Sequence, residues 1–120
     1  VCYDLRFPVW ARQTSNNEYD VLIYVANWPE KRSNAWKTLL VARAIENQAF
    51  VVGVNRVGLD GNNIAHSGNS MVVGPLGEVM YHCQDQEAVF QITLNREELE
   101  TTRNQFPFLK DADSFTIQST

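Results

Sequence analysis

A cysteine close to the start of the chain is followed by residue types that often accompany a reactive thiol. The stretch reads Val1-Cys2-Tyr3-Asp4-Leu5-Arg6-Phe7-Pro8. Proline suits the first turn of a helix, where its missing N–H is not needed, so Cys2 is expected at a turn between a strand end and a helix. A thiol in that position feels the positive end of the helix dipole, which favours the thiolate. This is the arrangement of a nucleophile elbow; the alternative is a small buried thiol that only packs.

Polar residues also follow two apolar runs that have the character of strands. The runs 21–26 and 50–54 are apolar without alternation, which predicts strands buried on both faces of a sheet. Asn27 and Trp28 follow the first run, and Asn55 and Arg56 follow the second. Sites in open α/β sheets gather beyond the carboxyl ends of the strands. We therefore expect these residues to lie at the same edge of the sheet as Cys2.

A helix is expected between the two strands, from Ser33 or Asn34, either of which could cap it, to about Ala49. Its wide apolar surface indicates burial against the sheet. A strand, a helix and a strand in this order predict a crossover and parallel pairing. Arg43 and Glu46 stand three residues apart on this helix and are expected to form a structural ion pair, with solvated surface charge as the alternative.

The remaining elements follow from turn-forming residues and local periodicity. Asn95 with Glu98 resembles a capping box that opens a helix to about residue 104. The other expected elements are a short helix at 7–16, a polar loop at 58–68, hairpin strands at 69–73 and 78–82, a strand at 87–94, and a tail from residue 111 that is poor in apolar residues.

The composition of the 120 residues is that of an ordinary soluble globular protein and disfavours several classes of partner. The net charge is −4, from 10 Lys and Arg against 14 Asp and Glu, which argues against nucleic acid and anionic membranes as partners. No apolar run approaches the roughly 20 residues needed to span a bilayer. Two cysteines are too few for a disulfide framework, which favours a cytoplasmic context. His82 and Cys83 are neighbours on an expected strand and point to opposite faces, so no metal site is expected.

Several segments resemble motifs of the nitrilase (carbon–nitrogen hydrolase) superfamily. Residues 2–8 resemble the nucleophile motif of that family, and residues 41–50 resemble its helix-to-strand motif. Further matches follow in the same order at 55–62, 67–70 and 74–78, while 24–29, 106–107 and 111–115 resemble the omega-amidase subgroup. Three positions depart from the family pattern: His66 stands where an aromatic ring is usual, and Asn69 and Gly74 stand where Asp is more common.

The resemblance implies a fold and a set of site residues. The fold would be α/β, with residues 1–120 forming the carboxyl-terminal part of a single domain that is a four-layer α-β-β-α sandwich. The family's catalytic Glu and Lys precede the nucleophile and would lie outside this chain. Cys2 would be the nucleophile, and the backbone N–H of Tyr3 would help to bind the oxyanion. Asn27 and Trp28 would line the substrate pocket, with a loop that merely packs its tryptophan as the alternative. Arg6 would support the elbow through an ion pair.

The implied activity is hydrolysis of the terminal amide of a short dicarboxylic or 2-oxo acid monoamide, through a cysteine thioester and with release of ammonia. The resemblance implies no cofactor, a small-molecule amide as substrate, and a homo-oligomer. Three alternatives remain open: another carbon–nitrogen hydrolase such as a carbamoyl amidase or a nitrilase, a non-catalytic fold or assembly module, and a redox role for Cys2 with Cys83 as its resolving thiol.

Overall fold

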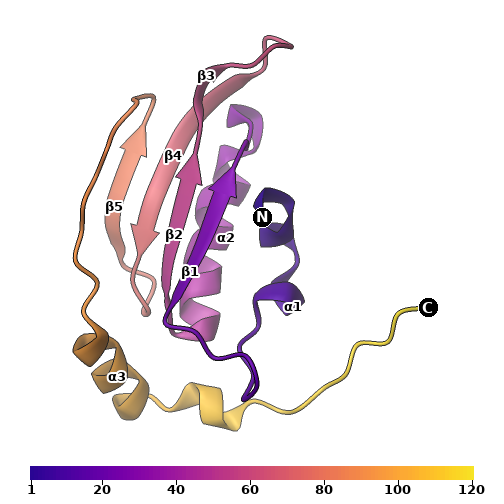
Figure 1. Ribbon diagram of the computed structural model, residues 1–120, viewed down its shortest axis with the longest axis vertical. Helices are drawn as coiled ribbons and strands as arrows, with labels where there is room; N and C mark the ends of the chain where they lie inside the picture. The colour runs from indigo at the N-terminus through magenta and orange to yellow at the C-terminus, as the bar shows by residue number, and fades with distance from the viewer.

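The computed structural model describes residues 1–120 as one five-stranded sheet with helices packed on one face and along one end (Figure 1). β1 and β2 are parallel, and the other pairings are antiparallel. β4 pairs with β2 and β3 along one edge and with β5 along the other. The strands are β1 (Val21–Ala26), β2 (Phe50–Asn55), β3 (Val57–Leu59), β4 (Ala65–Val73) and β5 (Val79–Gln84). The helical segments are η1 (Cys2–Arg6), α1 (Pro8–Ala11), η2 (Glu30–Arg32), α2 (Ser33–Asn47), α3 (Arg96–Gln105) and η3 (Phe108–Asp111).

The predicted strand–helix–strand unit is confirmed, with β1 and β2 joined by α2. This helix packs its apolar side on β2 and β4, where Trp36 and Leu40 are completely buried. Gly53 of β2 permits this close approach, because a Cβ atom there would lie 2.5 Å from Leu40 Cδ1. The rest of the core comes from Leu5, Tyr24, Trp28, Ala44, Val51, Met71 and Val73. Burial of each large apolar side chain stabilises the fold by roughly 1.5–3 kcal/mol.

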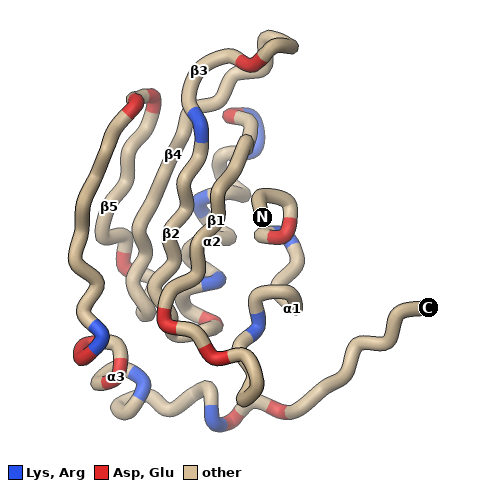
Figure 2. The backbone as a smooth tube through the Cα atoms, viewed as in Figure 1, with Lys and Arg blue, Asp and Glu red and all other residues tan.

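Only one face of the sheet is covered by α2 within these residues. Val21, Ile23, Val25 and Val54 point to the other face and are exposed. In Figure 1 this open face is turned towards the viewer, with α2 behind β1 and β2. Figure 2 shows that Lys, Arg, Asp and Glu lie on helices, turns and strand ends, and that β1 carries none of them. The expectation that both faces of β1 are buried is wrong for residues 1–120 alone, because one sheet with one helical layer covers a single face.

The helix predicted at 7–16 is wrong in extent. A five-residue 3₁₀-helix, η1, begins at Cys2 itself, and α1 contains only four residues. Arg12 is extended, with φ −63° and ψ 123°. The N–H of Gln13 is donated 2.9 Å to Asn47 Oδ1 of α2 rather than to a carbonyl of its own helix. A tertiary hydrogen bond has therefore replaced the local one.

The start of α2 also differs from the prediction. The helix does begin at Ser33, but neither Ser33 nor Asn34 caps it with a side chain. The preceding turn η2 runs directly into the helix, with the N–H of Arg32 bonded to the carbonyl of Pro29. The backbone of that turn thus replaces the side-chain cap.

Two predictions in the second half of the chain are wrong. The polar loop at 58–68 is mostly a β-hairpin, because β3 and the beginning of β4 pair across a turn in which Asp60 Oδ1 accepts the N–H groups of Asn62 and Ile64. Residues 87–94 form no strand. This segment returns beside β5 without a backbone ladder and is held by side chains, with the rings of Tyr81 and Phe90 stacked 3.7 Å apart.

The helix predicted after Asn95 is confirmed as α3. The side chain of Asn95 accepts the N–H groups of Glu97 and Glu98 at its start. None of the helices in the structure is both long enough and apolar enough to cross a bilayer.

Candidate active site

Cys2 lies at the beginning of η1, beside the carboxyl-terminal half of β1 (Figure 1). The thiol is half-buried and packs against the main core. Tyr3, the next residue, is 68% exposed. Of the short helix predicted at 7–16, only the four residues of α1 are helical. A side chain that attacks a substrate needs both a fixed backbone and access for the substrate. The contact of Cys2 with the core and its partial exposure provide these two conditions.

The short helix η1 is tied to the core by an arginine of α2. Arg43 is only 3% exposed, and its Nη2 donates a hydrogen bond to the carbonyl of Leu5 in η1. Its Nη1 lies 3.1 Å from Glu46 Oε1, which confirms the predicted ion pair. Burial raises the pKa of Tyr24 beside this pair, and the Arg43 charge opposes the rise. The helix-to-strand motif therefore holds the turn that carries the cysteine.

Asn27 and Trp28 lie on the loop that leaves the carboxyl end of β1, but their side chains differ in exposure. Asn27 is exposed, whereas Trp28 is 3% exposed and belongs to the core. The Trp28 indole N–H donates to the Arg32 carbonyl at 2.7 Å. The Arg6 guanidinium lies 4.6 Å from the centre of the Trp28 ring, a cation–π contact in place of the predicted ion pair. The η1 turn and the loop after β1 are therefore in direct contact.

Asn55, at the end of β2, is a residue whose role sequence reasoning missed. Its Oδ1 accepts the Trp28 N–H at 2.7 Å, and its Nδ2 donates to the Trp28 carbonyl at 2.9 Å. Sequence placed Asn55 at the correct edge of the sheet, but only the fold reveals that its side chain binds the neighbouring loop. A polar amide directly after an apolar strand was the one available signal.

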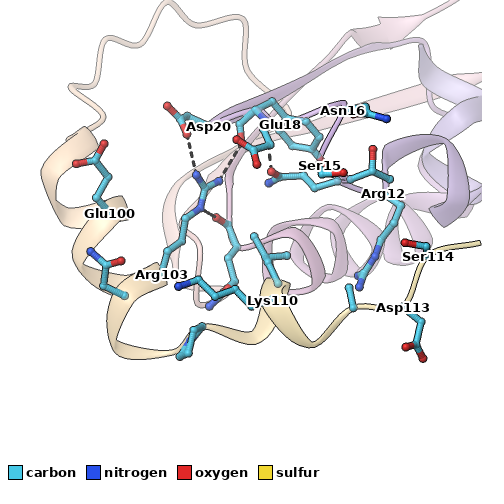
Figure 3. A pocket seen from close by; sticks show the side chains of 18 of the residues that line it. Arg12, Ser15, Asn16, Glu18, Asp20, Glu100, Arg103, Lys110, Asp113 and Ser114 are labelled. Atoms are coloured by element: carbon cyan, nitrogen blue, oxygen red, sulfur yellow. Dashed lines mark hydrogen bonds and ion pairs between the residues drawn. The ribbon is translucent and has the colours of Figure 1, made fainter.

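A polar cleft lies at the opposite end of β1 and is a poorer candidate for the active site. Its volume is about 930 Å³, and it is lined mainly by polar residues from the 12–20 segment, α3 and the tail. Figure 3 shows that Arg103 points at Asp20, with a separation of 2.8 Å, and Arg103 also donates to the carbonyls of Tyr19 and Gln48. Arg96 pairs with Glu100 at 3.0 Å. The charges of Arg103 and Arg96 in this cleft are therefore already paired with Asp20 and Glu100.

The two cysteines are both free and far apart. Cys2 packs beside β1, and Cys83 lies on β5 at the other edge of the sheet. Three strand spacings separate β1 from β5, about 14 Å, whereas a disulfide needs Cα atoms within about 7 Å. A redox couple between Cys2 and Cys83 within one chain is therefore incompatible with the fold. No group of three or more His, Cys, Asp and Glu side chains is placed to hold a metal ion.

Comparison with known proteins shows the family of the chain. Residues 1–104 match the carbon-nitrogen hydrolase family. The chain belongs to this family. Among solved structures, this carbon-nitrogen hydrolase is similar to XC1258 from Xanthomonas campestris, a CN-hydrolase superfamily protein, with a TM-score of 0.93 and 45% identity over 98% of the chain and 46% of XC1258.

Curated relatives of this carbon-nitrogen hydrolase include amidases. The omega-amidase YafV of Escherichia coli K12 is 49% identical over 118 residues, which are 98% of this chain and 45% of YafV. The 2-oxoglutaramate amidase of Paenarthrobacter nicotinovorans is 41% identical over 110 residues, or 92% of this chain and 37% of that enzyme. The chain thus spans about half the length of the curated relatives it matches, or less.

Proposed function

We propose that residues 1–120 are the carboxyl-terminal part of one omega-amidase-like catalytic domain, with Cys2 as its nucleophile. The observation that carries the proposal is the place of Cys2: it begins an anchored turn at the carboxyl edge of the sheet in a chain 49% identical to an omega-amidase. The proposed reaction is hydrolysis of the terminal amide of a short dicarboxylic or 2-oxo acid monoamide, for which 2-oxoglutaramate is the representative substrate.

In the proposed mechanism the Cys2 thiolate attacks the amide carbonyl carbon, forming a C–S bond and a tetrahedral oxyanion. The N–H of Tyr3 donates a hydrogen bond to that oxyanion. Collapse of the intermediate breaks the C–N bond, and the nitrogen leaves as ammonia with a proton from a general acid. Water then attacks the thioester, the C–S bond breaks, and the acid and the free thiol are released.

The general acid–base and the second oxyanion donor are proposed to be a Glu and a Lys from the remainder of the domain. Glu46 is occupied by Arg43 at 3.1 Å, and Lys37 lies on α2, a helix that packs against the sheet. Neither is positioned as a substitute beside the elbow. The exposed apolar side of β1 and β2 is consistent with a further layer of the same domain.

The pocket beside Cys2 is proposed to include the loop of Asn27 and Trp28. The exposed amide of Asn27 can donate a hydrogen bond to, and accept one from, the polar end of a substrate. The Trp28 ring is held by the core, so its contribution is a rigid wall together with its backbone. Binding between a rigid apolar surface and a few polar groups suits a short substrate.

Ammonia release by the complete polypeptide that contains these residues tests the proposal. Wild type, Cys2→Ala and Cys83→Ser are compared with 2-oxoglutaramate, an N-carbamoyl amino acid and a nitrile as substrates. Loss of a nucleophile typically costs at least about a thousandfold in turnover, so Cys2→Ala should be nearly inactive and Cys83→Ser should resemble wild type. A Cys2→Ala protein that keeps the wild-type rate would refute the assignment, and preference for the nitrile or carbamoyl compound would refute the omega-amidase specificity.

The assembly of the complete protein is proposed to be a homodimer. Tyr3, Phe7, Val9 and Trp10 form an exposed apolar group on η1 and α1, and such groups favour association. Sedimentation equilibrium would give the dimer mass if this is right and the monomer mass if it is wrong.

A further inference from the structure

The β1–β2 ladder ends just before the loop that carries Asn27 and Trp28. The last register partners are Ala26 and Asn55. Beyond this point no strand backbone is available to fix the loop, yet the loop lies beside the nucleophile turn, in contact with Arg6. Whatever fixes the backbone of this loop also fixes the direction of the Asn27 side chain.

The side chain of Asn55 continues the pairing where the backbone ladder stops. Its amide accepts the Trp28 N–H at 2.7 Å and donates to the Trp28 carbonyl at 2.9 Å. An Asn amide offers a donor and an acceptor side by side, as a strand backbone does. Because the Trp28 N–H belongs to the peptide that joins it to Asn27, and peptides are planar, this pair restricts the backbone on both sides of Trp28.

Asn55 is itself held from β4, so it is a rigid support. Its Nδ2 also donates to the Gly68 carbonyl at 2.9 Å. Its backbone N–H donates to Ser70 Oγ at 3.0 Å, and that hydroxyl donates back to the Asn55 carbonyl at 3.3 Å. The two β4 residues therefore fix both the main chain and the side chain of Asn55.

We propose that Asn55 is a positioning residue that sets substrate affinity by holding the Trp28 peptide, and thereby Asn27, at the edge of the nucleophile turn. This inference rests on the proposed amidase function. Asn55 does not touch the reacting atoms, so its loss should weaken binding of the ground state and the transition state alike. Such a loss raises KM and leaves kcat unchanged.

Two variants of the complete polypeptide separate positioning from simple stability. Asn55→Ala removes every side-chain hydrogen bond to Trp28. Asn55→Asp keeps the acceptor for the Trp28 N–H but places a carboxylate oxygen against the carbonyls of Trp28 and Gly68, which repel it. Asn47→Ala is the matched control, because Asn47 is a buried asparagine of α2 whose side chain bonds to the Gln13 N–H and the Arg43 carbonyl and not to the loop.

Steady-state kinetics with 2-oxoglutaramate should show a KM increase of about tenfold to a hundredfold for Asn55→Ala, since the loss of one or two hydrogen bonds from Asn27 to the substrate has an effect of about this size. Asn55→Asp should show at least as large an increase. In both variants kcat should stay within about threefold of wild type, and Asn47→Ala should lower the melting temperature without raising KM. An unchanged KM in Asn55→Ala, or a fall in kcat alone, would overturn the inference.

Hydrogen–deuterium exchange supplies a readout that does not depend on turnover. The amide of Trp28 should exchange faster in Asn55→Ala than in wild type, and Asn47→Ala should leave it unchanged. Equal exchange in wild type and Asn55→Ala would overturn the positioning role. A wild-type protein that does not hydrolyse 2-oxoglutaramate, but shows the expected exchange difference, would refute the proposed function and leave the loop anchor established.

Discussion

Replacement of Arg43 by methionine tests how the nucleophile turn is anchored to the fold. Arg43 is 3% exposed and is the residue that joins α2 to the Leu5 carbonyl. Methionine has a similar length and a flexible apolar chain, so it fills the space without the charge. The substitution leaves the Leu5 carbonyl without its partner, and Leu5 is completely buried.

The expected loss of stability follows from three contributions. An unpaired buried carbonyl costs about 1–3 kcal/mol. The lost partner of Glu46 costs roughly 0–1 kcal/mol, because 30% of that side chain remains exposed to water. Removal of the buried guanidinium, whose Nε has no hydrogen-bond partner, also removes the cost of desolvating that charge, and this offsets part of the loss of stability. The net expectation is a decrease of about 2 kcal/mol in the free energy of unfolding.

Urea unfolding of the complete polypeptide measures this decrease, with fluorescence of the buried Trp28 and Trp36 as the signal. Arg56→Met is the matched control: Arg56 also donates to a leucine carbonyl, that of Leu59 at 3.0 Å, but it is exposed. The control should change stability by less than about 0.5 kcal/mol. Arg43→Lys should fall between wild type and Arg43→Met, because an ammonium keeps the charge but lacks the planar fork. Equal stability of Arg43→Met and Arg56→Met would refute the anchoring argument.

Two further predictions concern the core and the β3–β4 turn. Leu40→Ala should lower the free energy of unfolding by about 2–5 kcal/mol and Gly53→Ala by about 1–3 kcal/mol. Because a Cβ at Gly53 would occupy space now filled by Leu40 and Trp36, the double variant should lose less stability than the sum of the two single variants. Strict additivity of the three values in urea unfolding would contradict this packing. The backbone N–H of Ile64, followed by that of Asn62, lowers the pKa of Asp60, so the stabilisation from its ionised form is present above pH about 4 and is lost as pH falls through the lowered value. An NMR titration should place the midpoint of the Asp60 carboxyl below the ordinary value of 3.8 and show the Ile64 amide shift following it, and a midpoint at or above 3.8 would exclude this turn chemistry.

Local sequence was sufficient for the elements whose stabilising contacts are close in the chain. The continuous apolar runs determined β1 and β2, and the helical spacing determined α2 between them. The Arg43–Glu46 pair follows from the geometry of one helical turn. The cap of Asn95 on α3 follows from hydrogen bonds within three residues.

Elements with distant partners were the ones that sequence reasoning placed wrongly. The helix after Pro8 stops at Ala11 because Gln13 bonds to Asn47, 34 residues away. The predicted polar loop at 58–68 is mostly a hairpin because β3 pairs with β4, and residues 87–94 make no backbone pairing with a strand. A local pattern records what a segment can form alone, and it does not record which neighbour completes its hydrogen bonds.

By itself the sequence determined which residues could do chemistry: a thiol before an aromatic residue, and amides directly after apolar strands. Only the tertiary structure decided how these residues are held. Arg43 reaches the Leu5 carbonyl across 38 residues, and Asn55 reaches the Trp28 peptide across 27. The physical reason is that side-chain hydrogen bonds to backbone groups depend on distance and direction in space, and these are fixed only when α2 and the sheet pack together.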